Sequence, residues 1–130
     1  MRSVFIFTKC PDLDRIKASL LNNGFVEGDT GMFIYHSPSG ECIWAHVADE
    51  IPELSATEKL NLVTAGGPFS SVICLDISGR FSDLDSARTL VRRVASFHPS
   101  VLMDDYSDDV WLVEELCGER KKHRAFLDPA

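Results

Sequence analysis

The strongest constraint on the fold comes from two short runs, residues 4–8 and 72–77, that are almost continuously apolar. Both runs are rich in β-branched or aromatic side chains, and neither alternates regularly with polar residues. Such runs are typical of strands in the interior of a sheet. We therefore expect both segments to be interior β-strands.

Helical patterns separate these strands. A first helix is expected to start after Pro11, to end before Gly24, and to place on one face Leu13, Ile16, Leu20 and Leu21. Residues 55–58 form a capping box, which predicts a short helix that ends at residues 66–68. A longer helix is expected from about Asp83, with an apolar face made of Leu84, Ala87, Leu90, Val91 and Val94.

Residues 32–36 and 42–47 predict a hairpin around a Pro/Gly turn, and residues 101–103 predict a short strand. Residues 110–113 fit either a last strand or a short helix. This order predicts an α+β fold: a mostly antiparallel sheet with helices on one face, as in a ferredoxin-like sandwich with additions. We expect one domain over residues 1–117, followed by a flexible, polar, basic tail over residues 118–130.

Composition fits one globular domain. The 130 residues are 45% hydrophobic and 25% charged, and no apolar run reaches the roughly 18 residues that a membrane span needs. The N-terminal residues do not resemble a secretory signal, so we expect a cytoplasmic protein. Its four cysteines lack zinc-site or C-x-x-C spacing, which predicts buried or idle thiols.

The acidic charge is concentrated before the tail. The net charge is −7, but the last 13 residues hold four basic and two acidic residues, so the first 117 carry −9. Phosphate backbones and anionic membranes should repel such a surface, and a basic protein should be attracted to it. The charge therefore argues against nucleic-acid and membrane partners.

Two acidic stretches are the candidate partner-binding residues. The longer one mixes six acids with two aromatic side chains of types that often anchor interfaces: Asp104, Asp105, Tyr106, Asp108, Asp109, Trp111, Glu114 and Glu115. The shorter one follows the hairpin and consists of Asp49, Glu50 and Glu53. Crowded carboxylates repel one another, so we expect a basic partner to meet them; a solvated hairpin loop is the plainer alternative for the longer stretch.

No motif predicts catalysis, a cofactor or a metal site. The hairpin would bring His36 and Cys42 together, but His46 is about 13 Å farther along the strand from Cys42, which leaves at most two ligands. The aspartate cluster lacks the glycine and the spacing of a calcium loop. Four aspartates on one exposed turn would all stay ionised, so they do not resemble an acid/base pair. We therefore expect a protein that is not an enzyme.

Residues 72–116 combine an interior strand, a long amphipathic helix, the run Val101–Asp105, a turn, and Val110–Trp111 followed by Glu114–Leu116. This third of the chain resembles small bacterial proteins that include immunity proteins of toxin systems used in contact-dependent inhibition. The resemblance implies an inhibitor of one cognate toxin, often a basic nuclease domain, which an acidic surface would suit. It assigns no role to individual residues.

Other functions remain open at this point. A small-molecule-sensing regulatory α+β domain is the main alternative, and its candidate pocket residues are Tyr35, Trp44 and His46. An enzyme would need a histidine or perturbed carboxylates in a cleft, and a structural accessory protein is the last alternative. The sequence does not determine the oligomeric state.

Overall fold

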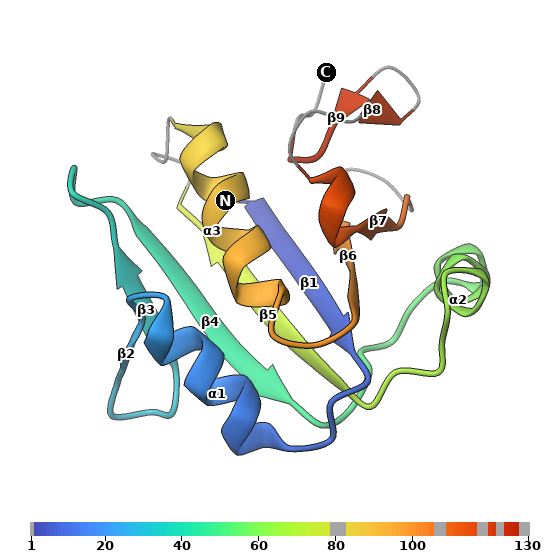
Figure 1. Cartoon of the computed structure of the whole chain (residues 1–130), viewed down its shortest axis with the longest axis horizontal. Helices are drawn as coiled ribbons and strands as arrows, with labels where there is room; N and C mark the ends of the chain where they lie inside the picture. Colours follow the sequence, from blue (N-terminus) through green and yellow to red (C-terminus); the bar gives the residue numbers. More distant parts are fainter. Residues whose placement is uncertain (1, 79–82, 106–108, 117–119, 122–123, 128–130) are drawn as a thin grey trace.

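The computed structural model describes residues 2–78, 83–105, 109–116, 120–121 and 124–127. Its centre is a seven-stranded antiparallel sheet in the order β2-β3-β4-β5-β1-β6-β7. Two helices lie across one face of this sheet. A third lies beside the edge of the sheet that is farthest from β2 (Figure 1). The predicted α+β class and the mostly antiparallel sheet are therefore confirmed.

The strands and helices agree closely with the sequence patterns. The strands of the main sheet are β1 (Arg2–Thr8), β2 (Val26–Glu27), β3 (Phe33–His36), β4 (Cys42–Ala48), β5 (Ser71–Ile77), β6 (Ser100–Asp104) and β7 (Trp111–Leu112). The helices are α1 (Leu13–Asn22), α2 (Ala56–Thr64), α3 (Leu84–Ala95) and the 3-10 turn η1 (Val113–Glu115). A small separate hairpin is formed by β8 (Arg120–Lys121) and β9 (Arg124–Ala125). Strand β2 was not predicted.

The two almost continuously apolar runs form the middle of the sheet. In β5 and β1, Ile73 pairs with Ile6, and Ile6 pairs in turn with Leu102 of β6. The chain passes through α1 between β1 and β2, and through α3 between β5 and β6, so each helix connects strands that are not neighbours. That this arrangement is a ferredoxin-like sandwich stays a prediction.

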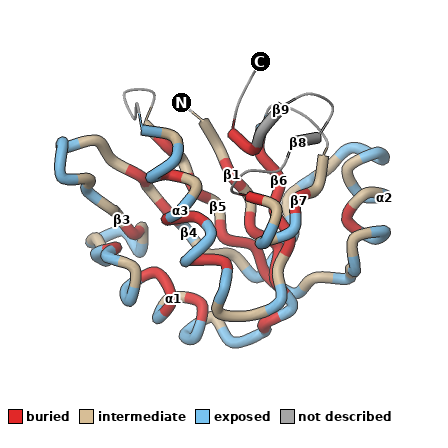
Figure 2. The backbone as a smooth tube through the Cα atoms, turned by 45° about the horizontal axis from the view of Figure 1, so that its top comes forward, coloured by how far each residue is buried: buried red, intermediate tan, exposed pale blue. Residues whose placement is uncertain are grey.

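Helices α1 and α3 cover the main core. Ile16 and Leu20 of α1 and Leu90, Val91 and Val94 of α3 are buried against Val4, Ile6, Ile73, Leu75 and Ile77 of the central strands. Side chains alternate between the two faces along each strand, so every second residue of these strands is buried under the helices. Figure 2 shows the buried residues concentrated in the strands and on the inner sides of these two helices.

The other face is covered differently. Its smaller core comprises Phe7, Leu62, Val72, Val101 and Met103, and α2 contributes only Leu62 to it. Helix α2 is therefore an exception to the prediction that the helices share one face, because it packs on the side away from α1 and α3.

The C-terminal residues correct the predicted domain boundary. Phe126 and Leu127 have no exposed surface and belong to the main core. Arg88 Nε of α3 donates a hydrogen bond of 2.6 Å to the Phe126 carbonyl oxygen. Phe126 and Leu127 therefore belong to the core of the domain, although they lie beyond its predicted end at residue 117. Two large apolar side chains near the end of the chain explain why it folds back.

Candidate functional site

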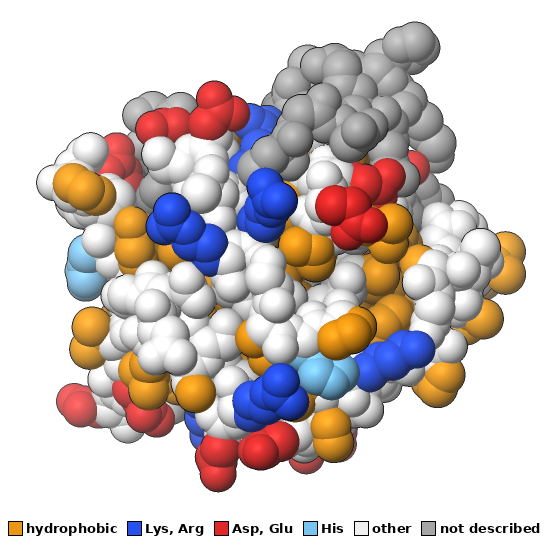
Figure 3. Space-filling view, in the orientation of Figure 1, with side chains coloured by type: hydrophobic (Ala, Val, Ile, Leu, Met, Phe, Trp, Pro, Cys, Tyr) orange, Lys and Arg blue, Asp and Glu red, His pale blue; other side chains and the backbone are white. Residues whose placement is uncertain are grey.

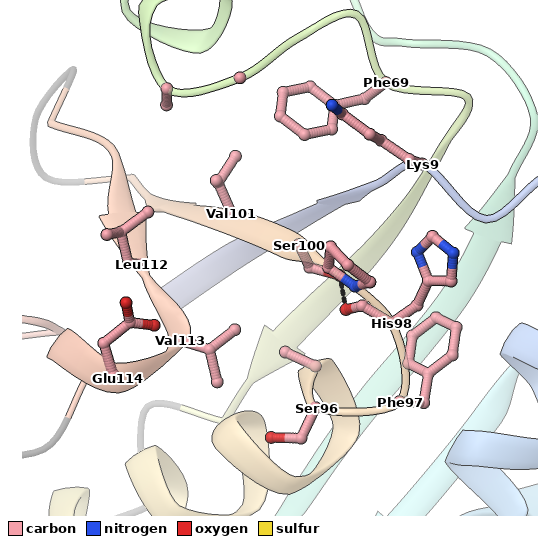
Figure 4. A pocket seen from close by; sticks show the side chains of 14 residues that line it. Lys9, Phe69, Ser96, Phe97, His98, Ser100, Val101, Leu112, Val113 and Glu114 are labelled. Carbon is pink, nitrogen blue, oxygen red and sulfur yellow. Dashed lines mark hydrogen bonds between the residues drawn. The ribbon is translucent and has the colours of Figure 1, made fainter.

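A groove of about 590 Å³ lies where β6 begins and α2 ends. Its floor includes Val101, and its walls come from segments far apart in the sequence. Figure 4 shows Lys9 and Phe69 on one side of the groove and Leu112 and Glu114 on the other. The groove gathers the residues just after β1 and α2, the end of α3, and parts of β6, β7 and η1. No single sequence motif could therefore have predicted it.

Local backbone contacts hold the Phe69 wall in place. Ser70 N donates a hydrogen bond of 2.9 Å to the Thr8 carbonyl oxygen. The Phe69 ring packs beside Phe7, with ring centroids 6.2 Å apart. These contacts fix the α2–β5 connection against the end of β1, so the apolar wall of the groove is preformed.

His98 lies at the other end of the groove. Ser100 Oγ donates a hydrogen bond of 2.8 Å to the His98 carbonyl oxygen, and the Phe97 ring lies 6.1 Å from the imidazole, centroid to centroid (Figure 4). The His98 Nδ1 atom is buried and has no hydrogen-bond partner within the part of the chain that the structure describes. A polar atom in that position favours a ligand or partner that supplies the missing hydrogen bond.

Exposed apolar side chains also lie on α2 and β7, the two elements beside the groove. Leu60 and Val63, one helical turn apart, are 65% and 66% exposed, and Leu112 is 39% exposed on the β7 side. Figure 3 shows hydrophobic side chains gathered along α2 and in the hollow between α2 and β7. Exposed apolar groups grouped beside a concave surface are typical of interaction sites in otherwise water-soluble domains.

Asp104 is wrongly assigned by the sequence to a partner-binding surface. It is 2% exposed, and its Oδ2 atom accepts a hydrogen bond of 3.0 Å from Leu127 N. A carboxylate with so little exposed surface cannot meet a partner without opening the core. Asp104 instead ties the returning C-terminal segment to β6.

Trp111 is also wrongly assigned. Its side chain has no exposed surface, and its ring meets Phe126 edge to face with centroids 5.6 Å apart. The alternation of β7 places Trp111 on the helix-covered face and Leu112 on the other. The aromatic anchor predicted for an interface is therefore part of the main core.

The other acids of the longer stretch are separated. Asp105 is exposed, and its Oδ2 atom accepts a hydrogen bond of 3.1 Å from Ser3 N. Glu115 Oε1 accepts one of 2.8 Å from Leu112 N, and Asp109 is half-buried. Glu114 is exposed and lines the groove. Tyr106 and Asp108 lie outside the described residues.

The shorter acidic stretch lies away from Asp105 of the longer one. Asp49, Glu50 and Glu53 are exposed in the segment that follows β4. The end of β4, Ala48, is level with Val101 at the start of β6, whereas Asp105 follows the opposite end of β6. The sheet therefore separates Ala48 from Asp105 by three strand spacings and about 13 Å of strand length.

The residues proposed for a small-molecule pocket also divide between the two faces. Tyr35 pairs with Ile43 and packs beside Phe25 on the helix-covered face, with ring centroids 5.6 Å apart. Trp44 and His46 project from the other face of β4 because they alternate with the core residue Ala45. These three side chains cannot line one pocket.

Cys42 and His36 form a pair of potential metal ligands. Cys42 Sγ lies 3.3 Å from His36 Nδ1, as the hairpin predicts. Within the described ranges, no group of three or more His, Cys, Asp or Glu residues could hold a metal ion. The helices in those ranges are also too short or too polar to cross a membrane.

Comparison of the chain with protein families, curated proteins and solved structures found no match. The function must therefore be inferred from the surface itself.

Proposed function

We propose that this chain is a binding protein whose groove between α2 and β7 receives an apolar anchor of a basic partner protein. The observation that carries the proposal is the pair Leu60 and Val63, both about two-thirds exposed on α2 beside the groove. Removing such surface from water yields roughly 25 cal/mol per Å². A partner that fills the groove and also covers the exposed side of α2 would bury all three.

Charge sets the partner's chemistry. The chain carries a net charge of −7, and Glu114 is an exposed acid on the β7 wall of the groove. Long-range attraction should speed association with a cationic protein, and Glu114 should orient a basic residue next to the apolar anchor. Lys9 on the opposite wall would repel the same cation, which gives the groove a polarity and hence a preferred orientation of its partner.

The identity of the partner as a toxin rests on the sequence resemblance alone. Under this proposal the chain is an immunity protein that neutralises one cognate toxin, of which a basic nuclease domain is the best electrostatic fit. Trp111 and Asp104 have no part in this interface. Glu114 is the acid that lines the groove.

The test begins with purification of the tagged chain from its native host at low salt, with elution in high salt. A stoichiometric basic protein is expected, and its activity should fall when the purified chain is added back. Its affinity should weaken as salt increases, because the screening length is about 10 Å at 0.1 M. A neutral or acidic partner, or an affinity independent of salt, contradicts the electrostatic part of the proposal.

Matched variants locate the interface. The double change Leu60→Ser and Val63→Ser should weaken partner binding by about tenfold to a hundredfold, as loss of apolar anchors does. The control is Leu21→Ser with Val26→Ser, since these side chains are 49% and 65% exposed on α1 and β2, near the opposite edge of the sheet (Figure 1). Equal effects of the two pairs would refute an interface at α2.

A small-molecule ligand is the second candidate, because 590 Å³ is a usual size for such a site. His98 of its lining also has a buried Nδ1 atom that finds no hydrogen-bond partner among the described residues. A metabolite that raises the melting temperature of the wild-type chain but not of a Val101→Trp variant would favour this function.

A further inference from the structure

The β3–β4 hairpin brings a thiol and an imidazole together. His36 and Cys42 are direct cross-strand partners, and Cys42 Sγ lies 3.3 Å from His36 Nδ1. Side chains of directly opposed residues in antiparallel strands point the same way, so both lie on the sheet face that α1 and α3 leave uncovered. His36 is exposed and Cys42 is partly exposed.

A hollow of about 500 Å³ adjoins this pair. It is lined by Cys42, Trp44 and Ser78, and by residues 39–41 of the turn. The hollow is far from the groove at α2, because it lies at the opposite end of β4. A small molecule entering it would lie beside both Cys42 and Trp44.

The other described cysteines lack these properties. Cys10 is 1% exposed and belongs to the main core. Burial raises the pKa of the Cys74 thiol to about 11, and the negative charge of Asp76 adds to this effect. At pH 8 only about one Cys74 in a thousand would be a thiolate, which is the nucleophilic form.

We propose that Cys42 is a site of reversible modification by a small disulfide, with His36 as the proton acceptor and the hollow beside Trp44 as the place where the attached group lies. This site is independent of partner binding at α2. Nothing in the reaction requires a metal or a protein cofactor.

The reaction is a thiol–disulfide exchange. The Cys42 sulfur attacks one sulfur of the small disulfide while its proton passes to His36 Nδ1. A new bond forms between the two sulfurs, the original disulfide bond breaks, and the released thiolate takes the proton from the imidazolium. Cys42 is thereby oxidised, and half of the small disulfide is reduced to a thiol.

Two carboxylates determine which disulfide reacts best. Glu41 borders the hollow, and Ser37 Oγ donates to its Oε2 atom at 2.6 Å, which lowers the pKa of Glu41 and keeps it charged. Asp76 is the cross-strand partner of Trp44, and its Oδ1 atom accepts a hydrogen bond of 2.8 Å from Ser3 Oγ. This negative environment should favour a cationic disulfide over an anionic one.

The experiment uses three disulfides of similar size: cystamine (dication), hydroxyethyl disulfide (neutral) and dithiodipropionate (dianion). Each is mixed at pH 7.5 with the full chain carrying Cys117→Ser, because Cys117 lies outside the described residues. Intact mass should show one fast addition per chain, and its rate should decrease from cystamine to dithiodipropionate. Equal rates for the three, or a faster anion, would overturn the charge argument.

Four variants assign the reaction and its charge preference to their residues. Cys42→Ser should abolish the fast addition, whereas Cys74→Ser should leave its rate unchanged. His36→Gln should slow it by about threefold to tenfold. Glu41→Gln should reduce the ratio of the cystamine rate to the dithiodipropionate rate. A fast addition that persists in Cys42→Ser overturns the site, and an unchanged rate in His36→Gln overturns the role of the imidazole.

Discussion

Helices α3 and α2 both begin with an N-cap hydrogen bond, but they differ in how many of their side chains are buried in the core. Asp83 caps α3 by accepting from Ser86 N, and Ser55 caps α2 by accepting from Glu58 N at 3.1 Å. Helix α3 then buries Ala87, Leu90, Val91, Val94 and Ala95, whereas α2 buries only Leu62. The caps determine where each helix begins, and burial determines whether it belongs to the core.

This difference gives the two regions different tasks. A helix with five buried side chains cannot move without exposing the core, so α3 is scaffold. A helix with one buried side chain loses little when it shifts or frays, and regions of low local stability often form binding surfaces. The exposed Leu60 and Val63 are therefore on the part of the molecule best able to adapt to a partner.

The largest effect on the free energy of unfolding is expected on the face of the sheet that α1 and α3 cover. Trp111→Ala should lower the free energy of unfolding by about 3–5 kcal/mol, because it removes a fully buried indole and its contact with Phe126. Urea unfolding measures the change. Trp44→Ala, a partly exposed indole on the other face, is the control and should cost clearly less. A stable Trp111→Ala protein that only loses its partner would restore the interface role predicted from the sequence.

A smaller effect is expected where the C-terminal segment returns to the core. Asp104→Ala should lower the free energy of unfolding by about 1–3 kcal/mol, because Leu127 N then loses its acceptor. The neighbouring exposed Asp105→Ala should change it by less than about 0.5 kcal/mol. Asp104→Asn, which keeps an acceptor oxygen, should recover part of the loss. Equal effects of the two alanine variants would argue against this contact.

The smallest effect is expected at α2. Ser55→Ala removes a cap and should cost about 0.5–2 kcal/mol, as N-cap deletions do. The loss should be local, so hydrogen exchange should accelerate for amides of α2 while those of α3 remain protected. Acceleration throughout the sheet would mean that α2 is coupled to the main core as tightly as α3, and the contrast between the two helices would fail.

Much of the fold was predictable because its signals are local. The α2 capping box, the apolar face of α3 and the hairpin that pairs His36 with Cys42 all depend on residues within about a dozen positions of one another. Residues 110–113 fit both a strand and a helix, and the structure contains both, with β7 followed directly by η1.

The binding surface was predicted poorly because burial is not local. In sequence, Asp104 and Trp111 look like parts of one polar, exposed turn with aromatic anchors. Their burial depends on Phe126 and Leu127, which return to the core from more than a dozen residues farther along the chain. The signal that could have revealed this was the pair of large apolar side chains in an otherwise polar segment.

The helix starts, the hairpin register and the net charge follow from local sequence, because caps, turns and charges act between close neighbours or through composition. Which face of each strand is covered, which acids stay in water and where a groove opens are settled by the packing of distant segments. Those properties depend on contacts between β1, α2, β6 and β7, and hydrophobic burial rewards whichever distant apolar groups can pack together.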